Sequence, residues 1–331
     1  MILVLVETDL EGAATEVSLE AVTFARDLSA AGNGVPVDAV VIGDVPVDAW
    51  EDLRAELATY GVRTVHRVGG DGVAAYSGAG WAAALVAVRE AAGSVVVMAA
   101  GTDRGNELMA HVAARSGASM AANVLSFSGL APFVVTRQVV GGAAMEEMNL
   151  HQRPAVFTVA GHAVEAKPAD VTGAGEVVEH TPEVLPEDLV ARVVSTEQTE
   201  ADQSGDLTSA KVVVGAGRGV GGAEKFDDVL ELTELLGAAL GVSRVVTSAG
   251  WRPHHEQVGQ TGSRISPDLY VPCGISGAIQ HWAGCSTAKT ILAINSDAEA
   301  PMVTRATYAV IGDLHEIVPA INAEIRKRGY S

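Results

Sequence analysis

A glycine-rich loop at 215–222 is the first segment whose residue types could bind a ligand. It follows a β-branched run at 212–214, and Gly217, Gly219 and Gly222 have the spacing G-x-G-x-x-G. In a nicotinamide dinucleotide fold this spacing lets the backbone approach a diphosphate. The chain has 36 glycines, so the spacing alone is weak, and a loop that needs positive φ values explains it as well.

The sequence lacks a second feature of the nicotinamide dinucleotide fold, the acidic residue that binds the ribose. That fold places an acidic residue about 20 positions on, at the end of the second strand, where it binds the ribose. Here we expect the second strand at 244–247, and it ends in Ser248. Arg218 is more informative, because a guanidinium at the carboxyl end of a strand is well placed to pair with a diphosphate.

A second candidate segment is the loop at 258–262. Gly259 and Gly262 bracket Gln260 and Thr261, and Val258 precedes them. Such a loop can bring two side-chain hydrogen-bonding groups and its own amides against the edge of a flat ligand. An ordinary polar turn would have the same composition.

A third segment gives the strongest local phosphate signal. A strand at 269–271 leads into a Gly-Ile-Ser-Gly turn at 274–277 and then a helix. Ser276 is a candidate N-cap, which would leave free amides at a helix start for an anion. His281 lies about one turn into that helix, where a structural and a functional role are equally well supported.

Two polar residues end later strands of the same domain. Asn295 follows a strand at 290–294 and Asp313 follows one at 309–311. Carboxyl ends of parallel strands meet ligands, so both residues are candidates for contacts to a ribose or base. Capping of an Asx turn is the simpler interpretation and the one that the sequence alone favours.

No metal site is expected. His254 and His255 are adjacent and would point apart in any regular element, and no further ligand lies at an i+4 spacing. Cys273, His281 and Cys285 would be three ligands without a fourth.

The elements that must position these residues follow a β-α-β rhythm, which predicts mostly parallel, doubly wound sheets. In the first part of the chain we expect strands at 2–6, 37–42, 62–68 and 94–99, and helices at 17–30, 50–60, 81–91 and 106–115. From about Ala121 the helices stop, and strands at 133–140, 155–160 and 176–179 predict an antiparallel extension.

A polar, acidic stretch at 195–209 predicts a linker. It separates an N-terminal α/β domain at 1–194 from a second α/β domain at 210–331. In the second domain we expect strands at 211–214, 244–247, 269–271, 290–294 and 309–311, and helices at 227–240, 278–283 and 316–328.

Composition limits the classes of function. The 331 residues include 22 Lys and Arg against 41 Asp and Glu, a net charge of −19. Such a chain would be repelled by nucleic acid and by anionic membranes. We find no apolar run long enough to span a bilayer and no signal peptide. Two cysteines fit a reducing cytoplasm.

Taken together, five segments resemble the C-terminal domain of the electron transfer flavoprotein alpha subunit family in order and separation. They are Gly217-Arg218-Gly219, Val258 to Gly262, Gly274 to His281, Ala293-Ile294-Asn295 and Gly312-Asp313-Leu314. The resemblance covers about 210–325, and the N-terminal half fits in length and rhythm. It implies an FAD-binding, Rossmann-like second domain and an electron carrier with no substrate turnover of its own.

The resemblance also implies which residues meet FAD. They are Arg218, Ser243, Arg244, Val258, Gly259, Gln260, Thr261, Ser276, Gly277, Ala278, Ile279, Gln280, His281, Asn295, Asp313 and Leu314. By the same resemblance Arg244 lies beside the isoalloxazine, Thr261 near its N5 and His281 near its N1/C2-carbonyl edge. A cationic or hydrogen-bond-donating His281 would then stabilise an added electron.

The resemblance further implies partners. The family works as a heterodimer with a beta subunit, which the N-terminal domain would dock. It takes electrons from flavin dehydrogenases, such as the acyl-CoA dehydrogenases of fatty acid β-oxidation, and passes them to a membrane quinone oxidoreductase. Two other interpretations stay open at this point: a nicotinamide-dependent oxidoreductase, and a non-redox nucleotide-binding regulatory module.

Overall fold

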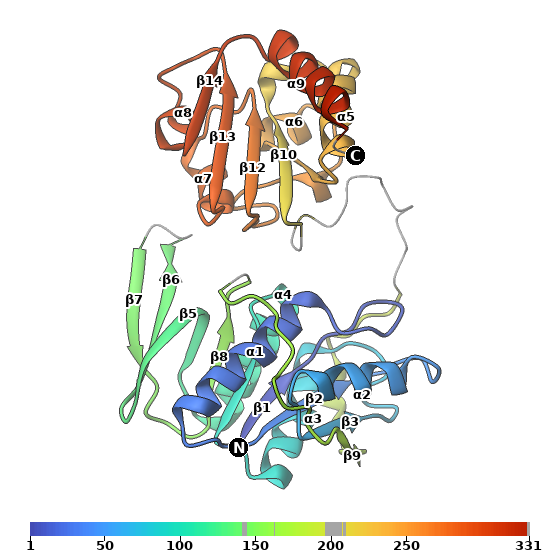
Figure 1. Ribbon diagram of the computed structural model, residues 1–331. Coiled ribbons are helices and arrows are strands. Elements are labelled where there is room, and N and C mark those ends of the chain that lie inside the picture. Colours follow the sequence, from blue (N-terminus) through green and yellow to red (C-terminus); the bar gives the residue numbers. More distant parts are fainter. Residues whose placement is uncertain (141–143, 162, 196–206, 208–209, 330–331) are drawn as a thin grey trace. The chain divides into compact units, whose positions relative to one another are not determined.

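The chain forms two compact α/β units. The structure, a computed structural model, describes residues 1–140, 144–161, 163–195, 207 and 210–329 (Figure 1). One unit comprises Met1–Val139 and Ala144–Glu197, and the other comprises Val140–Ala143 and Gln198–Ser331. Most of the linker expected at 195–209 lies outside the described residues, so its conformation stays a prediction.

The first unit is built on a mixed sheet in which, among the described residues, nine strands have the order β7-β6-β5-β8-β4-β1-β2-β3-β9. The strands are β1 Ile2–Leu5, β2 Val37–Ile42, β3 Thr64–Val68, β4 Val96–Ala100, β5 Met120–Leu130, β6 Phe133–Val139, β7 Ala144–Asn149, β8 Ala155–Val159 and β9 Glu176–His180. Strands β1 to β4 are parallel and almost wholly buried, as expected for a sheet covered on both faces.

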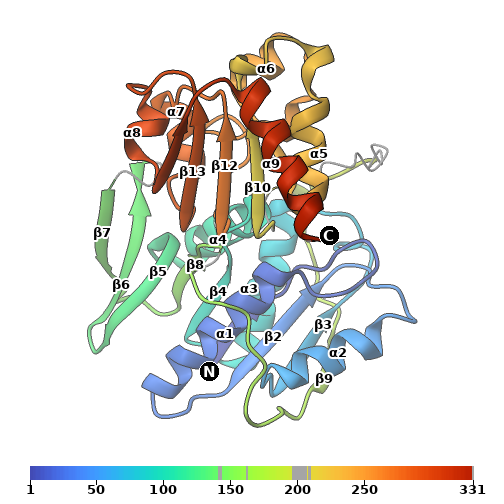
Figure 2. The ribbon, with the colours of Figure 1, turned by 45° about the horizontal axis from the view of Figure 1, so that its top comes forward.

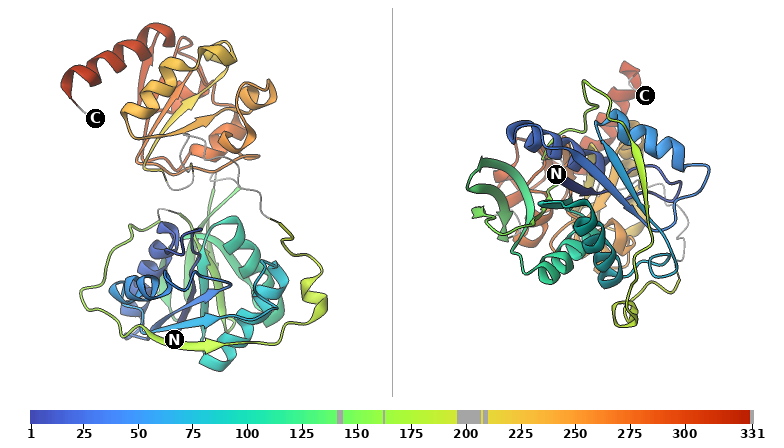
Figure 3. Two further views of the ribbon diagram at one scale, coloured as in Figure 1. Left: turned by 90° about the vertical axis from the view of Figure 1, so that its right-hand side faces the viewer. Right: turned by 90° about the horizontal axis from the view of Figure 1, so that it is seen from below.

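Helices cover both faces of this sheet (Figure 3, left). They are α1 Glu16–Ala31, α2 Trp50–Thr59, α3 Gly78–Ala92 and α4 Asp103–Ser116. One apolar cluster joins α1 and α2 to one face, and another joins α3 and α4 to the opposite face. The four expected helices and first four expected strands are confirmed, with ends shifted by a few residues.

The expected antiparallel extension is correct in part. Strands β5, β6 and β7 pair antiparallel in a meander, although the sequence analysis did not anticipate β5 and β7. Strands β8 and β9 are not part of it, because β8 pairs parallel with β4 and β5, and β9 pairs parallel with β3. Every residue of β8 is buried, which is typical of an interior parallel strand.

The second unit has an entirely parallel sheet, whose strands in the described part of the chain have the order β11-β10-β12-β13-β14. They are β10 Val212–Ala216, β11 Ala239–Val242, β12 Leu269–Cys273, β13 Thr290–Asn295 and β14 Tyr308–Ile311. The chain passes from β10 to β11 on one side of β10. It then crosses to β12 on the other side of β10 and continues outward through β13 to β14, so the order of strands reverses between β10 and β12. In open α/β sheets, ligands bind beyond the carboxyl ends of the strands at such a reversal.

Two layers of helices enclose this sheet (Figure 2). The helices are α5 Asp227–Leu235, α6 Arg244–Ser248, α7 Ile279–Cys285, α8 Pro301–Arg305 and α9 Leu314–Arg328. Helices α5, α6 and α9 share one apolar cluster with the sheet, and α7 and α8 share the other. Both cysteines of the chain, Cys273 and Cys285, are free and buried in these clusters.

The second unit differs from expectation between residues 235 and 248. The helix expected at 227–240 ends at Leu235, because Gly237 has φ +56° and closes it. The second strand is therefore Ala239–Val242, and the segment expected as a strand at 244–247 is helix α6. The residue that follows the true second strand is Ser243, so the acidic ribose-binding residue of a nicotinamide fold is still missing there.

No helix among the described residues combines the length and apolar character needed to cross a membrane.

Candidate cofactor-binding site

A cavity of about 600 Å³ lies at the carboxyl edge of the parallel sheet in the second unit. Its walls come from the segments that follow β10, β11, β12 and β13, together with the loop at 257–261 and the start of α7. The volume falls within the usual range for small-molecule sites. The cavity therefore stands where the strand order predicts a ligand.

Most of the residues expected to meet a ligand line this cavity. They are Arg218, Ser243, Arg244, Val258, Gly259, Gln260, Thr261, Ser276, Gly277, Ala278, Gln280, His281 and Asn295. They come from segments up to about 80 positions apart in the sequence, and the parallel sheet brings them together. Lining residues that the sequence analysis did not single out as ligand contacts include Gln257, Asp297 and Ala300.

Three expected residues do not line the cavity. Ile279 is 70% exposed. Asp313 is the N-cap of α9 and accepts a hydrogen bond from the amide of His315 at 2.9 Å. Leu314 is buried and lies behind the glycine turn, within van der Waals reach of Gly274. Asp313 thus caps α9, and Leu314 packs behind the turn that contains Gly274.

The glycine-rich loop after β10 is shaped by close packing against the turn after β12. A Cβ atom on Gly217 would lie 2.1 Å from the carbonyl oxygen of Gly274, and one on Gly219 would lie 2.7 Å from its Cα. Only residues without a side chain allow this approach. The loop places Arg218 at the cavity, exposed to solvent.

The turn at 274–278 offers backbone donors, although not in the expected way. Ser276 is not the N-cap of α7, because that helix begins at Ile279 after Ala278 and lacks a side-chain cap. Among the described residues, the amides of Ser276, Gly277 and Ala278 have no hydrogen-bond acceptor. Gly277 has φ +78° and packs against the backbone of Met302, which holds the turn and its three amides at the cavity wall.

The Asn295 side chain is engaged within the protein. Its Nδ2 donates to the carbonyl of Ile275 at 2.9 Å, and its Oδ1 accepts from the amide of Asp297 at 3.0 Å. These contacts match the capping role that the sequence favours, and they tie the end of β13 to the turn after β12. Asn295 nonetheless lines the cavity.

A buried glutamine orients the Thr261 hydroxyl. Gln257 is 2% exposed. Its Oε1 accepts from Thr247 Oγ1 at 2.7 Å, and its Nε2 donates to Thr261 Oγ1 at 3.0 Å. Thr261 Oγ1 is the acceptor in this bond, so its hydroxyl hydrogen is not used there. That hydrogen has no acceptor within the described residues and is free for a ligand.

His281 is buried in the cavity wall against Tyr270. Its Nε2 lies 2.8 Å from Tyr270 Oη, and its Nδ1 is buried away from solvent. Burial lowers the pKa of His281 to about 4, and the carbonyl of Val258 opposes this effect. The ring is therefore neutral at pH 7, so it can act at the cavity as a donor but not as a cation.

Positive charge at the cavity comes from arginine. Of the described lining residues, Arg218 and Arg244 are the cations and Asp297 is the carboxylate. Three unused amides and two guanidinium groups form a donor-rich wall. Such a wall suits a ligand that carries phosphate groups and hydrogen-bond acceptors.

Sequence reasoning missed Gln257 and Tyr270. Gln257 directly precedes the loop that was singled out, so extending that loop by one residue would have included it. Tyr270 lies in a strand, and an apolar strand pattern does not distinguish a core tyrosine from one whose hydroxyl serves a site.

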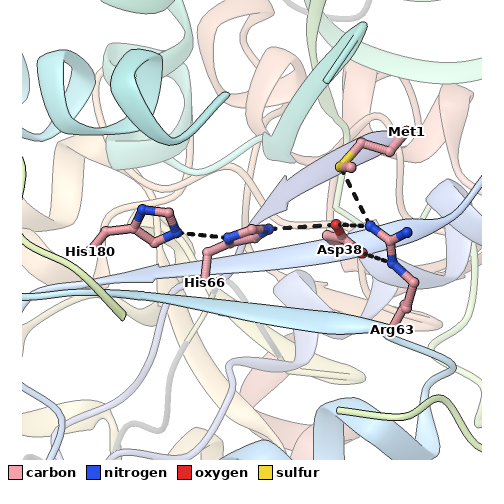
Figure 4. A network of polar contacts seen from close by, with 5 residues as sticks. All are labelled: Met1, Asp38, Arg63, His66 and His180. Carbon is pink, nitrogen blue, oxygen red and sulfur yellow. Dashed lines mark hydrogen bonds and ion pairs between the residues drawn. The ribbon is translucent and has the colours of Figure 1, made fainter. Parts of the chain in front are cut away.

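The first unit contains a separate polar network, shown in Figure 4. Arg63 donates two hydrogen bonds to the buried carboxylate of Asp38, from Nε at 3.0 Å and from Nη2 at 2.6 Å. His66 Nε2 lies 3.5 Å from the same carboxylate, and His66 Nδ1 lies 2.9 Å from His180 Nε2. The network ties the edge strand β9 to β2 and β3.

In the described residues, no group of three or more His, Cys, Asp or Glu side chains is arranged to hold a metal ion.

Comparison with known proteins gives matches to both units. Residues 2–185 match the electron transfer flavoprotein domain, and residues 206–286 match the electron transfer flavoprotein FAD-binding domain.

Relatives match along nearly the whole chain. The electron transfer flavoprotein subunit alpha of Mycobacterium leprae is 39% identical over 327 residues, which is 98% of this chain and 98% of that protein. Its counterpart in Thermoanaerobacterium thermosaccharolyticum is 33% identical and covers 96% and 95%. The Bacillus subtilis counterpart is 35% identical and covers 93% and 94%.

Proposed function

The chain belongs to the electron transfer flavoprotein alpha subunit family, is an electron carrier and binds FAD, and on this premise we propose that the cavity at the carboxyl edge of β10 to β13 is where FAD lies. The observation that carries the proposal is the convergence of thirteen resemblance-based positions on one cavity. The unused amides at 276–278 are polar groups that the cofactor would satisfy.

When bound, FAD supplies the one-electron redox chemistry. The protein's own residues bind and orient it. Arg218 and the amides of 276–278 would hold the diphosphate, because both present N–H donors to phosphate oxygens. The Thr261 hydroxyl and the neutral His281 ring would donate hydrogen bonds to the isoalloxazine, and the Arg244 guanidinium would stabilise added negative charge beside it.

We further propose the partners that the family implies. Family membership implies a heterodimer, and we assign its second chain as the beta subunit, docked by the first unit, with 195–209 as the linker to the flavin domain. We propose flavin dehydrogenases, such as the acyl-CoA dehydrogenases of fatty acid β-oxidation, as electron donors and a membrane quinone oxidoreductase as the acceptor. The net charge of −19 would steer encounters with basic partner surfaces. The two free, buried cysteines fit a reducing compartment, the cytoplasm.

The test is to purify the chain with a beta subunit and to measure the flavin content of unsubstituted, Arg218→Ala and Arg328→Ala proteins. Loss of charge-assisted hydrogen bonds of about 1.5–3 kcal/mol should weaken FAD binding by Arg218→Ala roughly 10- to 100-fold. Arg328 is 63% exposed at the end of α9 and is paired with Glu324, so Arg328→Ala should bind FAD normally.

The absorbance spectrum separates the alternatives. A yellow protein whose FAD is lost from Arg218→Ala on dialysis supports the assignment. A colourless complex would contradict the proposed FAD site, and full retention of FAD by Arg218→Ala would contradict the role of that residue.

A further inference from the structure

The connection between β11 and the loop at 258–262 leaves the sheet at 243 and returns to it after 256. The amide of Val258 donates to the carbonyl of Val242 at 2.9 Å, and Gln257 forms an isolated parallel bridge with Val242. Helix α6 lies within this connection. Arg244 at the start of α6 lines the cavity, as does Gln257 directly after the connection ends. The shape of the connection at 243–256 therefore determines where two parts of the cavity wall lie.

A buried ion pair closes this connection. The Glu256 side chain is 1% exposed and the Arg252 side chain is 20% exposed. Arg252 Nε donates to Glu256 Oε2 at 2.8 Å, and Arg252 Nη2 donates to Glu256 Oε1. Two hydrogen bonds from one guanidinium to one carboxylate fix orientation as well as distance. Neither residue lines the cavity, so any effect of the pair on a bound cofactor passes through other residues.

The burial of the carboxylate makes its partner necessary. In the described part of the chain, Arg252 is the cation paired with Glu256. A buried carboxylate that has lost its partner is strongly unfavourable. Loss of the guanidinium would therefore drive the connection to open until water reaches Glu256.

Gln257 would carry this movement to the cavity, because a peptide bond joins it to Glu256. The Gln257 side chain is 2% exposed. It accepts a hydrogen bond from Thr247 of α6 at 2.7 Å and donates one to Thr261 at 3.0 Å. A shift of Gln257 would disturb both bonds and change the spacing between Thr261 and α6, the helix that begins at Arg244.

We propose that Arg252 is a positioning residue of the flavin site, which holds Glu256 by its two-point contact and so keeps Arg244 and Thr261 at the spacing that binds FAD. The inference rests on the proposed location of FAD and deepens it. It assigns a function to an ion pair that lies outside the cavity.

This role has two measurable consequences in the folded protein. A displaced wall should bind FAD less tightly. The attraction between the Arg244 guanidinium and added negative charge falls with distance, so the preference for the reduced cofactor should fall as well. An ion pair that contributed to folding stability alone would leave both quantities unchanged.

The experiment uses the FAD-loaded heterodimer and measures the FAD dissociation constant and, by spectroelectrochemical titration, the one-electron potential. Arg252→Lys keeps the charge but cannot form the two-point contact. Arg252→Met removes the charge, and Arg252→Met/Glu256→Met leaves no buried carboxylate to open the connection. Arg328→Met is the matched control, because Arg328 pairs with Glu324 at the same i,i+4 spacing while 63% exposed.

We expect Arg252→Met to weaken FAD binding about tenfold and Arg252→Lys to weaken it about threefold. In Arg252→Lys the preference for the reduced cofactor should also fall about threefold, which corresponds to about 28 mV. Because lysine carries the same charge, this shift would come from geometry. The double variant should bind FAD within about threefold of the unsubstituted protein, and Arg328→Met should match that protein.

Three results would overturn the inference. The first is an Arg252→Met protein that matches the control in both affinity and potential. The second is an Arg252→Lys protein that matches the unsubstituted one, since charge alone would then suffice. The third is a double variant that binds FAD as weakly as Arg252→Met. An unsubstituted heterodimer that contains no FAD would instead overturn the proposed function, so the two failures are distinguishable.

Discussion

Replacing Asp38 by asparagine tests what holds the edge of the first sheet together. The Asp38 side chain is 1% exposed and its partner Arg63 is 44% exposed. Asparagine keeps the shape but removes the charge, and its amide turns N–H groups toward the donors of Arg63. Breaking a fully buried pair costs about 3–5 kcal/mol, and breaking a surface pair costs about 0–1 kcal/mol. Because water can solvate the half-exposed guanidinium, we expect a loss of about 2 kcal/mol.

The assay is hydrogen exchange read by mass spectrometry on the full chain. It reports the opening free energy of peptides from β2 and β3 separately from the second unit. A loss of about 2 kcal/mol should speed their exchange roughly 30-fold at pH 7. Glu51→Gln is the matched control, because Glu51 pairs with Arg54 while 69% exposed. Its substitution should change exchange little.

The pH dependence provides an independent check. Burial alone would raise the pKa of Asp38, but hydrogen bonds from His66 and Arg63 outweigh burial and lower it. A carboxyl with a lowered pKa stabilises the fold above its unfolded value, near 3.8, and loses this contribution as pH falls through the folded value. The gap between the two proteins should therefore hold above about pH 5 and shrink below pH 4. Equal protection of the two proteins at pH 7 would refute the reasoning.

Two further predictions use the same methods. Burial, and then the neighbouring His66, lower the pKa of His180. The stability of β9 should therefore decline as pH falls below about 6.5, and His180→Asn should flatten this decline while the exposed His151→Asn does not. An unaltered slope in His180→Asn would contradict the assignment. In the second unit, a Cβ on Gly284 would lie 2.4 Å from the backbone of Gly259 in the cavity wall. Gly284→Ala should therefore lower FAD content, with Gly69→Ala, which has open space, as the control. Full FAD content in Gly284→Ala would show that this close packing is dispensable.

Sequence patterns predicted the helices and strands that are determined by the local spacing of apolar residues and by glycines at helix ends. Helix α1 has apolar residues at helical spacing, strand β2 is a short, largely apolar run, and the glycines that close α3 and α4 have positive φ. Sequence patterns predicted the wrong element where pairing within the sheet outweighs the local propensity of the residues. Val245 and Val246 resemble a strand but form helix α6, while Ala239–Val242 looks weak and forms β11 because it pairs with β10.

Sequence patterns also failed to predict the direction of strands β8 and β9. The described residues that directly precede β8 and β9, within 150–154 and 160–175, contain no helix that would signal a parallel crossover. The sequence alone therefore suggested antiparallel strands. For the site, resemblance supplied residues that converge on the cavity. The contact between Tyr270 and His281 and the contact between Gln257 and Thr261 depend on distances between side chains, which no local pattern encodes.

The two cysteines of the second unit have a chemical consequence for a redox carrier. Burial raises the pKa of Cys273 and of Cys285 to about 12. Oxidants and alkylating agents attack the thiolate, and at neutral pH almost no thiolate exists at these positions. Both thiols of this unit are thus chemically unreactive at neutral pH, and the carrier can be reduced and reoxidised repeatedly without sulfenic acid or mixed disulfides forming at them.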